Sequence, residues 1–121
     1  MSFILVPNVG SDVVINGWNW RPTLILLNRA GLLSDEEYER MGANGCGGCA
    51  DAEKAKQFAD VIDAQLKGMK EGERMRADLS VTAAPQPLDL KSDPNELYSA
   101  CFDWLVRFRD FCRSSGGFEV V

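Results

Sequence analysis

The sequence predicts an α+β, mostly α fold, in which a single compact helical domain over residues 1–121 carries a small sheet made from the chain ends. Two long segments, 51–70 and 94–115, place apolar residues at helical spacing. Both ends are short and apolar, at 3–6 and 118–121, as expected of strands. A chain of 121 residues without an internal repeat suits one domain.

Two short strands and a helix are expected in the N-terminal part. Residues 2–6 form an apolar run that is closed by a proline, and residues 12–16 form a second extended segment that ends at an Asn-Gly pair. A helix over 21–30 follows. Pro22 suits its first turn, where a missing amide donor costs nothing, and Gly31 suits the position just past its end.

The middle of the chain predicts a short helix, a loop and a long helix. Ser34 and Glu37 have the spacing of a capping box, which opens a helix that ends near Gly42. The loop over 42–48 is rich in glycine. The helix over 51–70 then gathers its apolar residues on one face: Ala55, Phe58, Ala59, Ile62, Leu66 and Met69.

The C-terminal part predicts an irregular segment, one helix and a strand. Residues 79–92 show no helical pattern. Asp93 suits a helix cap and Pro94 the first helical position, so one helix is expected over 94–115. Its broad apolar face contains Leu97, Tyr98, Cys101, Trp104, Leu105, Phe108, Phe111 and Cys112.

Charge and hydropathy exclude two kinds of partner. The net charge is −5 and the charges are interspersed, whereas binding of a phosphate backbone needs a basic stripe. The aliphatic run at 24–27 is far shorter than the roughly 20 residues of a membrane span. The first residues lack the basic start of a signal peptide. We therefore expect a cytoplasmic protein with reduced cysteines and with no nucleic-acid or membrane partner.

The absence of histidine narrows the possible chemistry. The chain has none, which excludes Ser-His-Asp hydrolysis, Cys-His nucleophilic catalysis and metal sites with histidine ligands. We therefore assign no catalytic, cofactor-binding or metal-binding residue and expect no cofactor. An enzyme that works through Asp, Glu and Arg alone stays open, because carboxylates need no histidine to transfer protons.

The four cysteines fall into two pairs. Cys101 and Cys112 are eleven residues apart on one expected helix, about 16 Å, too far for a shared zinc ion or a disulfide. We expect both to be buried in the core and inert. Cys46 and Cys49 have CxxC spacing in a glycine-rich loop before a helix, where a thiolate is stabilised. They are the candidate residues of the alternative function, a thiol-redox or thiol-metal protein.

Two features indicate protein–protein interaction. Trp18, Trp20 and Arg21 stand together at a loop-to-helix junction and are the residue types that dominate binding hot spots. We expect at least one of the two tryptophans to pack on the last helix instead. Glu36 and Glu37 belong to an acidic cluster that would attract a basic partner protein.

Two segments link the chain to other proteins: Trp-Asn-Trp-Arg-Pro-Thr at 18–23 and Phe-Arg-Asp-Phe-Cys-Arg-Ser-Ser-Gly-Gly-Phe at 108–118. In these two segments the chain resembles a group of small stand-alone bacterial proteins of unassigned activity. The resemblance implies a compact domain and a bacterial source, and it carries no catalytic motif. In size and acidity the chain is also similar to immunity proteins that neutralise toxins, an analogy of type. The expected function is that of a non-enzymatic protein-binding protein, accessory or immunity-like.

Overall fold

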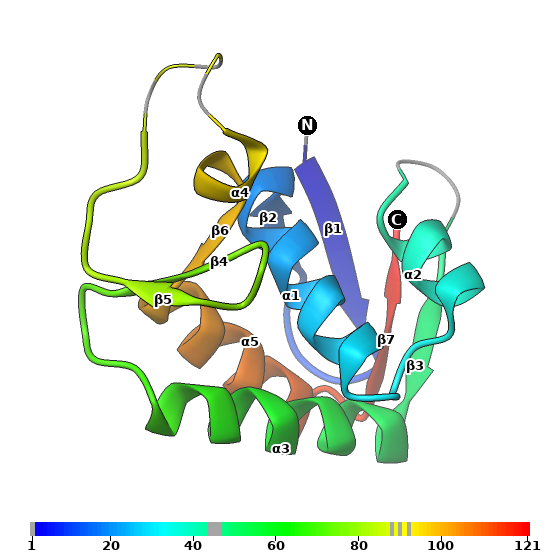
Figure 1. Ribbon diagram of the computed structural model, residues 1–121. Helices are drawn as coiled ribbons and strands as arrows, with labels where there is room; N and C mark the ends of the chain where they lie inside the picture. The colour runs from blue at the N-terminus through cyan, green and yellow to red at the C-terminus, as the bar shows by residue number, and fades with distance from the viewer. Residues whose placement is uncertain (1, 44–46, 88, 90, 92) are drawn as a thin grey trace.

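The computed structural model describes residues 2–43, 47–87, 89, 91 and 93–121, and it contains two antiparallel sheets (Figure 1). The first has the strand order β2-β1-β7-β3 and the second the order β5-β4-β6. The strands are β1 (Ser2–Pro7), β2 (Val13–Asn16), β3 (Cys49–Asp51), β4 (Arg74–Arg76), β5 (Val81–Thr82), β6 (Ser99–Cys101) and β7 (Gly117–Val120). The helices are α1 (Gly17–Arg29), α2 (Asp35–Met41), α3 (Ala52–Lys67), α4 (Pro94–Leu97) and α5 (Phe102–Ser114).

The expected fold class is therefore wrong. The protein is a mixed α/β domain with two sheets, and not a mostly helical domain with a small sheet from the chain ends. In Figure 1 the two sheets lie on opposite sides of α1, with α3 and α5 packed below them. Three of the strands, β3, β4 and β6, have only three residues each, too few to show an alternating pattern in the sequence.

The first sheet places its alternate side chains in the core. Phe3 and Leu5 of β1 are buried, and so are Val13 and Ile15 of β2, while the residues between them face outward. β7 is a central strand, since it pairs with β1 on one side and with β3 on the other. The pairing of β1 with β7 joins the two ends of the chain, and β2 and β3 extend the sheet beyond them.

Helix α1 begins earlier than expected. The side chain of Asn16 caps it by accepting a hydrogen bond of 2.9 Å from the amide of Asn19. Asn16 and Gly17 suggest a turn in the sequence, but in the fold they open the helix. Pro22 consequently lies inside the helix, where it cannot donate to the carbonyl of Trp18. The helix ends as expected, with Gly31 in the left-handed conformation at φ 81°.

The single helix expected over 94–115 is divided into α4 and α5. Strand β6 lies between them and pairs with β4, with Arg74 opposite Cys101. The buried guanidinium of Arg74 donates to the backbone oxygens of Ala84 and Glu96 and, at 2.9 Å, to the carboxylate of Glu96. These tertiary bonds compensate for the helical bonds that are lost at the break.

The apolar faces of α3 and α5 pack against each other beneath the first sheet, and their expected burial is confirmed. The buried residues are Ala55, Phe58, Ala59, Ile62 and Leu66 of α3 and Trp104, Leu105, Phe108, Phe111 and Cys112 of α5. At the rim of this contact Arg109 of α5 donates to Asp63 of α3 at 3.0 Å. Lys67 and Arg113 lie 3.6 Å from the same carboxylate.

These three cations change the acidity of Asp63. Partial desolvation raises the pKa of Asp63, but the hydrogen bond from Arg109 and the charges of Lys67 and Arg113 outweigh it and hold the pKa below its usual value. A carboxylate with a lowered pKa in the folded state stabilises the protein above the unfolded pKa of about 4, and this contribution disappears as the pH falls through the lower folded value.

We predict that Asp63→Asn lowers the free energy of unfolding near neutral pH and that its difference from wild type shrinks below about pH 4. The variant removes the charge that pairs α3 with α5. Urea unfolding at a series of pH values measures the difference. Asp60→Asn is the matched control, since Asp60 is exposed on the same helix and forms no ion pair with a described residue. A difference for Asp63→Asn that persists unchanged to about pH 2 would contradict the account.

Candidate functional site

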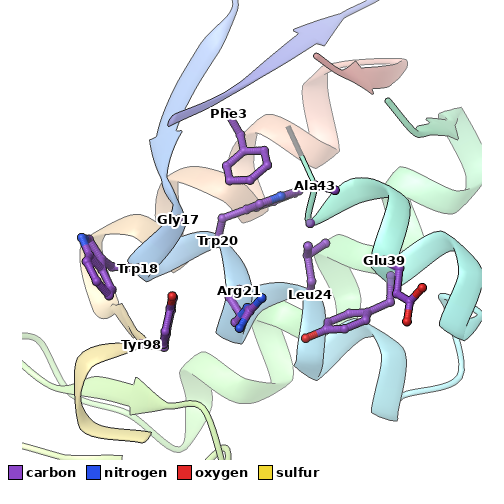
Figure 2. A pocket seen from close by; sticks show the side chains of 11 residues that line it. Phe3, Gly17, Trp18, Trp20, Arg21, Leu24, Glu39, Ala43 and Tyr98 are labelled. Carbon is purple, nitrogen blue, oxygen red and sulfur yellow. The ribbon is translucent and has the colours of Figure 1, made fainter. Parts of the chain in front are cut away.

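A half-open groove of about 540 Å³ lies between α1, α2 and the residue that follows α4 (Figure 2). We call it the aromatic groove. Its walls contain five aromatic side chains, and its lining is Phe3, Gly17, Trp18, Trp20, Arg21, Leu24, Tyr38, Glu39, Gly42, Ala43 and Tyr98. The volume falls in the range of roughly 300–1,000 Å³ that is usual for ligand-binding pockets.

One end of the aromatic groove is a stack of three side chains. The rings of Trp18 and Tyr98 are 4.9 Å apart and tilted by 44°. The guanidinium carbon of Arg21 lies 5.0 Å from the centre of the Tyr98 ring, within the reach of a cation–π interaction. Trp18 and Arg21 are three residues apart on α1, so they lie on neighbouring positions of its surface. Figure 2 shows Tyr98 between them.

Arg21 is exposed, and the described residues leave its hydrogen-bond donors unused. Its exposed guanidinium forms no ion pair or hydrogen bond with any residue of the described ranges, and its ring contact with Tyr98 uses none of its N–H groups. An arginine has five such donors in a planar fork that matches a carboxylate. Glu39 of α2 supplies a negative charge elsewhere in the lining. The groove therefore offers apolar walls with one group of each charge.

Trp20 forms the floor of the groove and contributes little surface. It is 1% exposed, and its indole N–H donates to the backbone oxygen of Met41 at 2.9 Å. Its ring meets Trp104 at 6.3 Å and Phe108 at 5.5 Å, edge-on in both cases. The expected packing of one tryptophan on the last helix is thus observed for Trp20, while Trp18 stays half-buried beside Tyr98.

The two glutamates proposed from the sequence lie outside the groove lining. Glu37 completes the expected capping box by accepting from the amide of Ser34 at 3.0 Å, and this hydrogen bond holds the pKa of Glu37 below its usual value. Glu36 pairs with Arg40 at 2.8 Å on the exposed surface. Glu39 belongs to the same acidic cluster and was not proposed as a site residue, yet it is the carboxylate that reaches the groove.

Phe3, Tyr38 and Tyr98 were also missed as site residues. They come from β1, α2 and the end of α4, and only the tertiary structure brings them together. The sequence contains a partial signal, because the chain has only two tyrosines and both line this groove. Both rings remain half-buried rather than joining the core.

The cysteines differ from the expectation at one position. Cys112 is buried, and desolvation raises the pKa of its thiol well above the usual range. Cys101 is exposed, so its predicted burial is wrong. The break between α4 and α5 makes Cys101 the residue that precedes α5, and it therefore leaves the apolar stripe of that helix. Cys49 is exposed in β3, and Cys46 lies outside the described residues.

Two further observations concern metals and membranes. Within the described ranges, no three or more Cys, Asp or Glu side chains gather where they could hold a metal ion. The described helices include none that is both long and apolar enough to cross a bilayer.

Comparisons of the chain with protein-family models, with curated proteins and with solved structures gave no match.

We predict that Cys101→Ser changes the free energy of unfolding by less than about 0.5 kcal/mol, as is usual at the surface. Cys112→Ser places a hydroxyl in the apolar core and should cost about 1–3 kcal/mol. Chemical denaturation compares the two variants, and labelling with a thiol reagent should modify Cys49 and Cys101 before Cys112. Equal destabilisation by the two substitutions would contradict this assignment.

Proposed function

We propose that this chain is a non-enzymatic binding protein, accessory or immunity-like, that receives a partner protein in the aromatic groove. The observation that carries the proposal is the stack of Trp18, Tyr98 and Arg21. It holds a cation beside an apolar hollow, and no described residue accepts a hydrogen bond from that cation. Tryptophan, tyrosine and arginine are the residue types that supply most of the binding energy in protein interfaces. A bacterial source and a cytoplasmic location are part of the same proposal.

The chemistry of the groove describes the segment that would fit. An apolar or aromatic side chain of the partner would enter between the aromatic walls, which lose little conformational entropy on binding. An acidic group of the partner would meet Arg21, and a basic group would meet Glu39. Binding through these few anchors resembles the hot-spot arrangement of known interfaces.

The charge around the groove favours a partner that is basic elsewhere on its contact surface. The chain has a net charge of −5, and Asp35, Glu36 and Glu39 are exposed on α2 beside the groove. Complementary charge raises the rate at which two proteins associate, and the effect weakens in salt. Charge-reversal variants should therefore use Glu36 or Glu39, since Glu37 stabilises the start of α2.

We predict that Trp18→Ala and Arg21→Ala each reduce retention of the partner by roughly 30-fold, the effect of a hot-spot residue. The measurement is affinity capture from lysate of the native host at low salt, followed by titration of the captured protein against each variant. Arg29→Ala is the matched control, because Arg29 is an exposed arginine of the same helix outside the groove.

Two results would remove the support for this function. One is the absence of any specific protein in the capture with the wild-type chain at low salt. The other is binding by Trp18→Ala and Arg21→Ala that equals binding by Arg29→Ala, since the partner would then use another surface. Circular dichroism and thermal unfolding of each variant confirm that the loss of binding is not a loss of fold.

A further inference from the structure

The outer face of the first sheet carries an exposed apolar row. Val14 of β2 is 55% exposed, Ile4 of β1 38% and Val121, directly after β7, 54%. Ile4 lies opposite Val14 on one side, and it exchanges hydrogen bonds of 3.1 and 2.9 Å with Val121 on the other. Residues that face each other across antiparallel strands have side chains on the same face. The three side chains therefore form one row across the sheet.

This row contains most of the large apolar surface residues. Within the described ranges, the exposed large hydrophobic residues are the three in the row and Val9, which is 67% exposed in the loop between β1 and β2. Single exposed apolar residues are ordinary, whereas neighbouring exposed apolar residues that form a patch are a candidate interaction surface. The row ends at β2, which is an edge strand.

The hydrogen bonds of the sheet show which groups the edge leaves open. Ile4 uses both its N–H and its C=O on Val121, so these groups point away from β2. The facing residues Ile4 and Val14 are consequently a non-hydrogen-bonded pair. In such a pair the N–H and C=O of Val14 point away from β1, toward the open edge. Neither group has a hydrogen-bond partner among the described residues.

The side chains of β2 include none of those that normally discourage pairing at a sheet edge. The four residues Val13–Asn16 include no lysine, proline or charged side chain. Val14 presents one donor and one acceptor on the same side of the strand. A second copy of Val14, related by a two-fold axis, would satisfy both groups at once, because it would donate to the first copy and accept from it.

The polar residues on either side of Val14 complement each other in this arrangement. With Val14 opposite its own copy, Asp12 lies opposite Asn16 of the second chain, twice by symmetry. The oxygen of the Asn16 side chain already accepts from Asn19, so its amide N–H groups are available. The carboxylate of Asp12 is an exposed acceptor for them. A strand of another protein would form the two Asp12–Asn16 contacts only if its own sequence placed matching polar residues opposite Asp12 and Asn16.

We infer that the protein forms a symmetric dimer by antiparallel pairing of β2 with β2 of a second copy. The two apolar rows then meet at Val14 and continue through both sheets, and cross-strand contact between the two valines adds to the backbone bonds. The contact is small, since a standard interface buries about 800 Å² on each partner. We therefore expect a reversible dimer with Kd on the order of 10–100 μM. This inference is independent of the aromatic groove.

The test is sedimentation equilibrium of the purified full chain between about 5 and 500 μM, where a dimer of the expected Kd dissociates on dilution. The wild type should show a monomer–dimer equilibrium. Val14→Lys places two ammonium groups opposite each other at the dyad and should raise Kd by at least about tenfold. Val9→Lys is the matched control, since it adds the same charge at an exposed valine outside the row.

A third variant tests whether the dimer contact lies at the edge of the first sheet or on its outer face. Val121→Lys changes the far end of the row, two strands from the edge, and should leave the dimer intact. Three results would overturn the inference. The first is a wild type that stays monomeric up to about 500 μM, and the second is a Val14→Lys variant that dimerises like Val9→Lys. The third is loss of the dimer in Val121→Lys, which would place the contact on the sheet face. Circular dichroism of all variants checks that each retains the fold.

Discussion

The hydrogen bond from the buried indole of Trp20 to the backbone oxygen of Met41 is the contact on which the rest of the site depends. It joins α1 to the end of α2, and the same ring packs against Phe3 of β1 and against Trp104 and Phe108 of α5. A buried indole N–H without a partner would be costly, so the bond and the ring packing require one position of α1. That position directs Trp18 and Arg21 toward the solvent.

Two further side chains of α1 fix its position, Thr23 against α5 and Asn19 against the second sheet, and they bring Tyr98 to the groove. Thr23 accepts from the indole of Trp104 at 2.9 Å, and Asn19 accepts from the amide of Cys101 at 2.9 Å. Cys101 belongs to β6, and Tyr98 precedes that strand directly. The short break between α4 and α5 thus has a structural consequence: it places the Tyr98 ring between Trp18 and Arg21, where an unbroken helix would have placed it on an apolar stripe.

Local signals in the sequence predict this structure better than contacts between distant residues do. The capping box of Ser34 and Glu37, the left-handed Gly31 and the apolar faces of α3 and α5 depend on neighbours within a few residues, so the sequence predicts them. The pairing of β4 with β6 joins distant residues and is accompanied by the ion pair of buried Arg74 with half-buried Glu96, and no local pattern indicates it. For the same reason Trp18 and Arg21 could be proposed from the sequence, whereas Tyr38, Glu39 and Tyr98 could not.

The most direct test of the central role of Trp20 compares Trp20→Phe with Trp18→Phe by urea unfolding. Phenylalanine keeps an aromatic ring at position 20 but removes the N–H, which leaves the buried oxygen of Met41 without its donor. We expect Trp20→Phe to lower the free energy of unfolding by about 1–3 kcal/mol. For Trp18→Phe, at a half-buried position, we expect a change within about 0.5 kcal/mol. Equal changes in the two variants would contradict the central role of the Trp20 N–H.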